Sequence, residues 1–191
     1  MEEQVSSTVK TYISEPVSMS NPVFDKIINR ISKSYPNSCV CFINEIKNNT
    51  LQKAFDNKKI EIENRLKNEN SHIEVKIEQL FHGTNKSAIE SICKTGFLTR
   101  FNRTSAYGKG TYFARDAQYS FSYMRDVTHG LSYMFLADVL VGNKQRGSSG
   151  NRAPHGVDNW VDNIQNTSIY VTPYDAGAYP RYVIAFHKNA K

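Results

Sequence analysis

The sequence lacks long apolar runs and a basic leader, and each absence narrows the class of protein. No uninterrupted apolar stretch approaches the roughly 20 residues that a membrane-spanning helix requires. The N-terminal residues carry acidic side chains in place of the basic and then apolar segments of a secretory signal. We therefore expect a protein that does not cross a membrane and that is located in the cytoplasm or the nucleus.

The sequence also has too few cysteines for a disulfide framework or a zinc site. Cys39 and Cys41 lie on the same side of an expected strand, where they are poorly placed to bridge each other, and Cys93 is the third. The five histidines do not stand beside these cysteines at the spacings of a zinc site. We expect reduced, structural thiols and no bound metal.

Acidic residues are scarce in the second part of the chain. Residues 1–80 hold 11 Lys or Arg against 11 Asp or Glu, whereas residues 81–191 hold 13 against 7, so the net charge of +6 lies in the second part. A basic face suits an anionic ligand such as a nucleotide or a nucleic acid. A basic surface with no such partner is equally compatible with this charge, because charge specifies a sign and no partner.

Length and apolar spacing predict a single domain. The chain of 191 residues suits one core. The first 20 residues show no sustained periodicity, and we expect a flexible tail over 1–20 and the domain over 21–191. Helical spacing from Val23, a strand over 38–46 and a helix over 50–68 are followed by short strands around a compact helix at 85–96.

Two short motifs in the second part are candidates for chemistry. In LFHGT, His82 ends an expected strand and Gly83 lets a ligand approach the backbone, although a lone histidine in this place is more often structural. In GKGTYFA, Lys109 is followed by Gly110 and a strand, whereas a P-loop requires Ser or Thr and then a helix. The second motif is therefore not a P-loop.

The helix after GKGTYFA adds a hydroxyl and a ring. Ser120 and Tyr123 stand three residues apart and share one helix face, and Tyr112 precedes them on the strand. Two rings with a hydroxyl between them suit a flat heterocycle that bears an amide. Packing without a ligand is the alternative.

Taken in this order, the motifs resemble the catalytic domain of the poly(ADP-ribose) polymerases, which are diphtheria-toxin-like ADP-ribosyltransferases. The resemblance rests on LFHGT, GKGTYFA, the Ser-x-x-Tyr pair and the closing AYPRYVIAF, and it spans about residues 21–188. It implies an α+β ADP-ribosyltransferase fold, with two packed antiparallel-rich sheets and flanking helices. It further implies that NAD is bound as a co-substrate without a Rossmann motif and without a metal.

The resemblance assigns four residues to the nicotinamide end of NAD. The Gly83 backbone would pair with the carboxamide, which Ser120 would also contact. Tyr123 would stack on the nicotinamide ring, and Tyr112 would close the other side.

Other residues would hold the ribose and phosphate groups. By the same resemblance, His82 would bind the nicotinamide-side ribose, and Thr84 would lie towards the adenosine ribose. The loop 97–107 corresponds to the family's donor loop over NAD. Its Arg100 or Arg103 would meet the pyrophosphate.

A glutamate that polymerising relatives use to extend the chain is missing here. They place it at the start of the penultimate strand, where this sequence has Ile169, or Tyr170 if the register slips by one. The last glutamate is Glu90, while Asp162 and Asp175 lie in the preceding loop and at the far end of that strand. Without a base at this point, the resemblance implies transfer of a single ADP-ribose unit, most readily to Asp or Glu side chains of an acceptor protein.

Two other functions remain open at this level. One is a catalytically silent module that binds NAD or ADP-ribose, and the other is transfer to phosphorylated nucleic-acid ends, which the basic second part would favour.

A further departure from the family is Arg181, where many relatives carry glutamate, and it would alter the acceptor surface. We expect a monomer, and the identity of the acceptor protein is not predicted.

Overall fold

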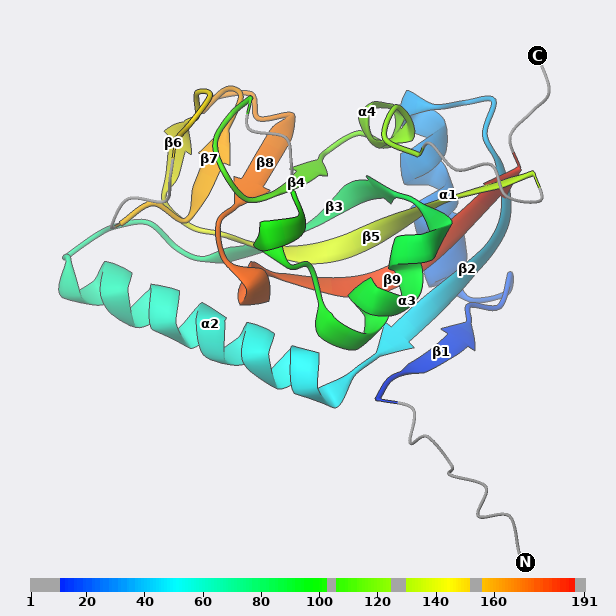
Figure 1. Ribbon diagram of the computed structural model, residues 1–191, viewed down its shortest axis with the longest axis horizontal. Helices are drawn as coiled ribbons and strands as arrows, with labels where there is room; N and C mark the ends of the chain where they lie inside the picture. The colour runs from blue at the N-terminus through cyan, green and yellow to red at the C-terminus, as the bar shows by residue number, and fades with distance from the viewer. Residues whose placement is uncertain (1–10, 103–105, 125–129, 152–155, 188–191) are drawn as a thin grey trace, which may run out of the picture.

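The computed structural model describes residues 11–102, 106–124, 130–151 and 156–187 (Figure 1). Within these residues, nine strands form one sheet in the order β1-β2-β9-β5-β3-β4-β8-β7-β6. Every pairing is antiparallel except that of β6 with β7. The strands are β1 (Ile13–Pro16), β2 (Cys39–Lys47), β3 (Lys76–Thr84), β4 (Thr111–Ala114), β5 (Leu131–Val141), β6 (Lys144–Arg146), β7 (Asn159–Val161), β8 (Ile169–Thr172) and β9 (Ala178–His187).

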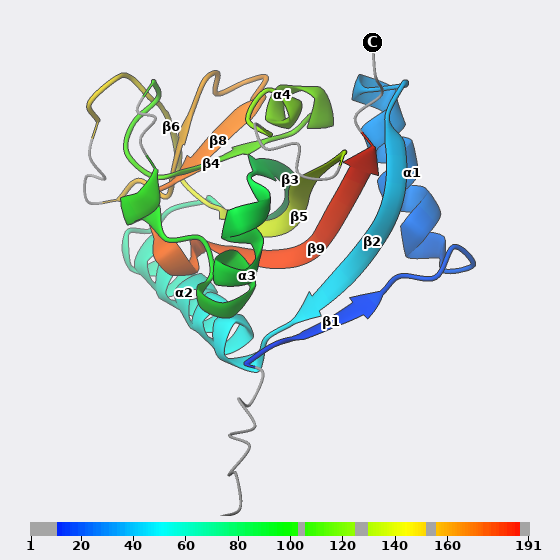
Figure 2. The same ribbon diagram turned by 45° about the vertical axis from the view of Figure 1, so that its right-hand side comes forward.

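Helices cover both faces of the long strands (Figure 2). They are α1 (Pro22–Ser34), α2 (Asn49–Asn68), α3 (Lys86–Thr95) and the short α4 (Ala117–Phe121), with 3₁₀ turns at Thr99–Phe101 and Asp175–Gly177. None of the helices in the described residues is long and apolar enough to cross a membrane. The α+β class and the predominance of antiparallel pairing are confirmed.

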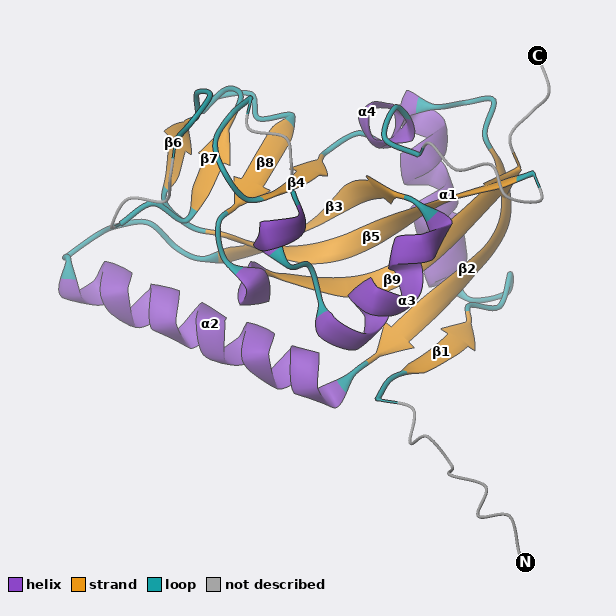
Figure 3. Ribbon diagram, in the orientation of Figure 1, coloured by secondary structure: helices purple, strands orange, loops and turns teal. Residues whose placement is uncertain are grey.

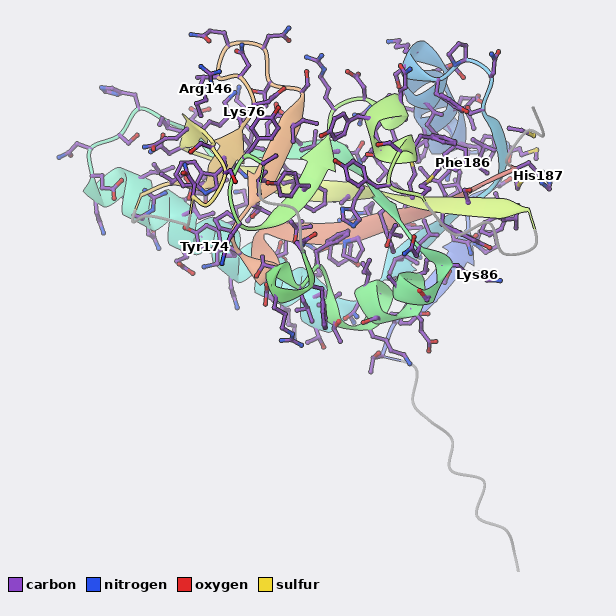
Figure 4. The ribbon with its side chains drawn as sticks, turned by 45° about the horizontal axis from the view of Figure 1, so that its top comes forward. Lys76, Lys86, Arg146, Tyr174, Phe186 and His187 are labelled. Atoms are coloured by element: carbon purple, nitrogen blue, oxygen red, sulfur yellow. The ribbon has the colours of Figure 1, made fainter. Side chains whose placement is uncertain are left out.

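Successive side chains of β5 point to opposite faces of the sheet and pack into two layers of the core. Phe135 and its alternate neighbours face a cluster that includes Cys93 of α3, whereas Met134 and Leu136 face a cluster that includes Ile31 of α1. Phe186, near the end of β9, is buried in the second cluster beside α1 (Figure 4). Because successive strand residues point to opposite faces, one strand supplies both layers.

The sheet has two parts that meet at a single point. The short edge strand β1 and the long strands β2, β9, β5 and β3 form one part, and the short strands β4, β8, β7 and β6 form the other (Figure 3). Between β3 and β4 the only registered pair is Phe81 with Ala114. The two antiparallel-rich sheets that the resemblance implies correspond to these two parts, which the pair Phe81–Ala114 joins into one hydrogen-bonded sheet.

The expected tail over residues 1–20 contains a strand. Strand β1 pairs with β2, with Ser14 opposite Ile46, and residues 1–10 lie outside the described residues. A strand of four residues that ends in Pro16 is too short to show an apolar period, and all four residues are exposed. Edge pairing, which the sequence pattern does not reveal, supports this strand.

Candidate active site

A pocket opens where β3 and β4 diverge. Its walls are the end of β3, the strand β4 and the helix α4, which lies over the two strands (Figure 1). No charged side chain is among the described residues that line it. They are His82, Gly83, Thr84, Asn85, Asn102, Tyr112, Phe113, Ala114, Tyr119, Ser120 and Tyr123. The pocket therefore brings together most of the residues that the motifs singled out.

The His82 ring spans the gap between the two diverging strands. Its Nδ1 lies 2.8 Å from the carbonyl oxygen of Tyr112. A carbonyl only accepts, so Nδ1 carries the proton, and Nε2 is left as an acceptor when the ring is neutral. The rings of Phe97 and Phe113 lie 5.1 and 5.5 Å from that of His82, centroid to centroid. Burial lowers the pKa of His82, and the bond to the Tyr112 carbonyl opposes this only in part.

The lowered pKa of His82 predicts a pH-dependent stability. Below the ordinary value of 6.5, the unfolded chain binds a proton at His82 that the folded chain resists. The free energy of unfolding should therefore fall as pH drops below about 6.5, and this contribution should be constant above it. The melting temperature, measured between about pH 5 and 8, should fall more steeply towards acid pH in the wild type than in His82→Gln. Equal slopes would contradict a His82 ring whose pKa desolvation lowers.

Gly83 allows β3 and α4 to approach each other closely. A Cβ at Gly83 would lie 2.0 Å from the Ser120 carbonyl oxygen and 3.3 Å from the Tyr123 Cβ. Ser120 is 3% exposed, and the Tyr123 N–H donates to its carbonyl oxygen at 3.1 Å. The contact therefore places the Gly83 backbone, the Ser120 side chain and the Tyr123 ring around one end of the pocket.

Tyrosine rings form the walls and the mouth of the pocket. The Tyr112 hydroxyl donates to the Gly108 carbonyl at 2.7 Å and accepts from the Tyr107 N–H at 3.0 Å, so its proton is not available to a ligand and its ring forms the pocket wall. Burial raises the pKa of Tyr112. Tyr123 is 37% exposed, and its hydroxyl lies 3.3 Å from that of Tyr119. The motifs did not identify Tyr119, although its spacing of four residues from Tyr123 was a usable signal. Tyr123 itself lies just past α4, beyond the C-cap Ser122, and not on the helix as its spacing from Ser120 predicted.

A second cavity continues from the first along the 3₁₀ turn at Thr99–Phe101. The two cavities share His82, Thr84 and Asn102, so an elongated ligand could occupy both. Arg100 lines neither cavity, and its guanidinium carbon lies 5.0 Å from the Phe101 ring centroid. Arg103, the other candidate for the pyrophosphate, lies outside the described residues.

Ile169 lies behind the pocket wall. It pairs with Ala114, which lines the pocket, and is 3% exposed in a cluster with Trp160 and Val171. Tyr170, the alternative for this position, lines neither cavity. The strand thus presents an apolar side chain beside Ala114.

The carboxylates of the two nearby aspartates already accept hydrogen bonds from backbone N–H groups. Asp162 accepts from the N–H groups of Ser168 and Ile169, both at 3.0 Å. Asp175 accepts from the N–H and the hydroxyl of Thr99 at 2.8 Å. Both carboxylates therefore order loops, and neither lines the pocket.

Arg181 lies in a structural contact away from the pocket. Its Nε donates to Asp138 at 2.9 Å and its Nη2 to the Gln52 side chain at 3.2 Å. The guanidinium carbon lies 4.6 Å from the Tyr179 ring centroid. These contacts hold the Arg181 side chain half-buried, and its effect on the acceptor surface stays a prediction.

The α+β fold, with a sheet that divides around a pocket walled by aromatic rings and lined by no charged side chain among the described residues, is that of an ADP-ribosyltransferase. Comparison with known proteins gives the family. Residues 24–167 match the poly(ADP-ribose) polymerase catalytic domain, and the chain belongs to this family. The resemblance inferred from the motifs is confirmed.

Several relatives of this chain carry mono-transferase names. It is 32% identical over 185 residues to the protein mono-ADP-ribosyltransferase PARP12 of Mus musculus, with 92% of this chain and 25% of the relative covered. It is 31% identical over 194 residues to the protein mono-ADP-ribosyltransferase PARP11 of Homo sapiens, with 86% and 56% covered. The chain thus spans a quarter of the first relative and just over half of the second.

Proposed function

We propose that this chain transfers one ADP-ribose unit from NAD to an acceptor and releases nicotinamide. The observation that carries the proposal is the contact of Gly83 with Ser120 at the end of the pocket between β3 and β4. It sets backbone amide groups beside a hydroxyl, with aromatic rings on two sides. A carboxamide on a flat ring offers matching donors and acceptors, and nicotinamide has this shape.

Each wall of the pocket has a function in this proposal. Tyr123 stacks on the nicotinamide ring from the exposed side, and the Tyr112 ring closes the other side. His82 accepts a hydrogen bond from a ribose hydroxyl through Nε2, because its Nδ1 proton is held by the Tyr112 carbonyl. Thr84 and Asn102 extend the site into the second cavity, towards the rest of the dinucleotide.

The reaction breaks the bond between the nicotinamide nitrogen and the ribose anomeric carbon. The electron pair of that bond stays on the nitrogen, so nicotinamide leaves neutral, and the ribose carbon develops oxocarbenium-like charge. An acceptor oxygen then donates an electron pair to that carbon. The protein contributes mainly by holding both ends of the glycosidic bond in a fixed orientation, which supplies much of the rate in such reactions.

The apolar side chain of Ile169 beside Ala114 supports the transfer of a single ADP-ribose unit. Extending an ADP-ribose chain requires a ribose hydroxyl to lose its proton, and a carboxylate is the base suited to removing it. Ile169 cannot act as a base, and Asp162 and Asp175 are occupied by backbone donors. The mono-transferase names of PARP12 and PARP11 agree with this limit.

A protein Asp or Glu is the acceptor that this site suits best. A carboxylate is already deprotonated at neutral pH, so its attack on the anomeric carbon needs no base from the enzyme. The product is an ester, which neutral hydroxylamine cleaves.

The acceptor is tested by incubation with labelled NAD, followed by hydroxylamine. Loss of label from the protein band would support carboxylate acceptors. Retention of label on protein would exclude them. Label found instead on an added 5′-phosphorylated oligonucleotide would favour nucleic-acid ends. NAD binding without any label would favour a silent module.

A further inference from the structure

Two side chains bridge the point at which β3 and β4 diverge, one on each side of the pair Phe81–Ala114. On the pocket side, the His82 ring reaches the Tyr112 carbonyl. On the opposite side, Nη2 of Arg30, which comes from α1, donates to the Gln79 carbonyl at 2.7 Å and lies 3.5 Å from the Arg115 carbonyl. Gln79 precedes Phe81 on β3, and Arg115 follows Ala114 at the end of β4. The Arg30 guanidinium thus occupies a place where backbone pairing is absent.

The surroundings of Arg30 indicate a role in fixing the backbone. Its guanidinium carbon lies 5.0 Å from the Phe81 ring centroid, and among the described residues it forms no ion pair within 4.0 Å. Burial lowers the pKa of Arg30, with Glu78 and Asp116 acting in the opposite direction. Arginine still remains charged, and its planar donors suit two carbonyls that diverge. Burying part of a charge is costly unless the charge is hydrogen-bonded, and here main-chain carbonyls on two segments accept from it.

Helix α1 also supports α4, which carries the pocket residue Ser120. The rings of Tyr35 and Phe121 stack with centroids 4.0 Å apart, and the Gln118 N–H lies 3.4 Å from the Ser34 hydroxyl. Since Arg115 stands two residues before α4, a contact to its carbonyl lies next to the start of α4. Arg30 therefore contacts both β3 and the segment that leads into α4.

We propose that Arg30 is a positioning residue that sets the width of the pocket by holding β3 and the start of α4 at a fixed separation. This inference rests on the proposed function of the pocket. The Gly83–Ser120 contact leaves no room for one additional carbon, so a small rotation of α4 would move Ser120 away from the Gly83 backbone. Substrate binding should respond to Arg30 although this side chain does not line the pocket.

The test compares Arg30→Met and Arg30→Lys with the wild type, using benzamide as a nicotinamide mimic. Methionine keeps the apolar stem and removes every donor, whereas lysine keeps the charge without the planar donors that reach two carbonyls. The dissociation constant for benzamide should rise about tenfold in Arg30→Met and by less in Arg30→Lys. The KM for NAD should rise in the same order.

Arg65→Met is the matched control. Arg65 is also half-buried and donates to both carboxylate oxygens of Asp158 at 2.8 Å, and neither residue lines the pocket. Loss of Arg65 should lower the melting temperature at least as much as loss of Arg30, because the buried Asp158 carboxylate loses its charged partner and keeps, among the described residues, only the Asn143 N–H at 2.7 Å. Benzamide affinity should nevertheless stay at the wild-type value. Equal weakening in Arg65→Met, or wild-type affinity in Arg30→Met, would overturn the inference.

Hydrogen exchange separates this inference from the function on which it rests. The amides of residues 115–123 should exchange faster in Arg30→Met than in the wild type, and those in Arg65→Met should not. If the wild type binds neither benzamide nor NAD, the proposed function is wrong. Unchanged exchange in Arg30→Met would refute the positioning role itself, whether or not the ligands bind.

Discussion

Gly83→Ala should reduce ADP-ribose transfer by about a hundredfold or more, although it adds a single carbon. That carbon would lie 2.0 Å from the Ser120 carbonyl oxygen, a distance that no real contact allows. Because the obstacle is backbone, β3 and α4 must separate, and both Ser120 and Tyr123 move with α4. A displacement of about 1 Å at a reacting group can cost two orders of magnitude in rate. Nicotinamide release from NAD, measured at saturating NAD, gives the loss directly.

Gly150→Ala is the control for this substitution. A Cβ at Gly150 would meet nothing within 4 Å, although its φ of 85° makes any side chain strained there. This variant should lose some stability and retain transfer. If Gly83→Ala kept more than about a tenth of the wild-type rate, the close contact could not be what positions the nicotinamide end of the site.

Ile169→Glu should destabilise the fold by about 3 kcal/mol or more and should not produce polymer. Ile169 is 3% exposed and packs with Ala114, Trp160 and Val171, so a carboxylate there would be buried among apolar groups. Its pKa would rise, and a protonated acid cannot act as a base. Chemical denaturation measures the loss, and a polymer-specific digestion of the product measures any elongation.

The control variant Ile169→Val changes the size of the side chain at this position without adding a charge. Removing one methylene from the same cluster should cost about 1 kcal/mol and leave single transfer unchanged. Polymer formation by Ile169→Glu would show that the position faces the reacting groups in the working enzyme. The limit to one unit would then depend on this side chain alone.

The motif residues come together in one pocket because the motifs are local in sequence and lie on neighbouring elements. LFHGT ends one strand and GKGTYFA forms the neighbouring one, so pairing of β3 with β4 brings His82 and Tyr112 together. The spacing of Ser120 and Tyr123 then places both at the same end. Each of these steps follows from strand and helix geometry.

Residues contributed by tertiary packing were not predictable in this way. Arg30 lies 49 residues before Gln79, and nothing in its helical surroundings distinguishes it from a solvated arginine. Asn102 enters the pocket only through the fold of the loop after α3. The join between the two parts of the sheet was not predictable either, because a single residue pair forms it.

The most direct test of the account is the product made from labelled NAD by the wild type and by His82→Ala. His82 presents its Nε2 acceptor to the pocket, so the substitution should remove transfer without requiring the fold to fail, which circular dichroism checks. We expect a sharp labelled band from the wild type that resists an enzyme specific for poly(ADP-ribose), and no band from the variant. A digestible smear, or an undiminished band from His82→Ala, would contradict single transfer at this site.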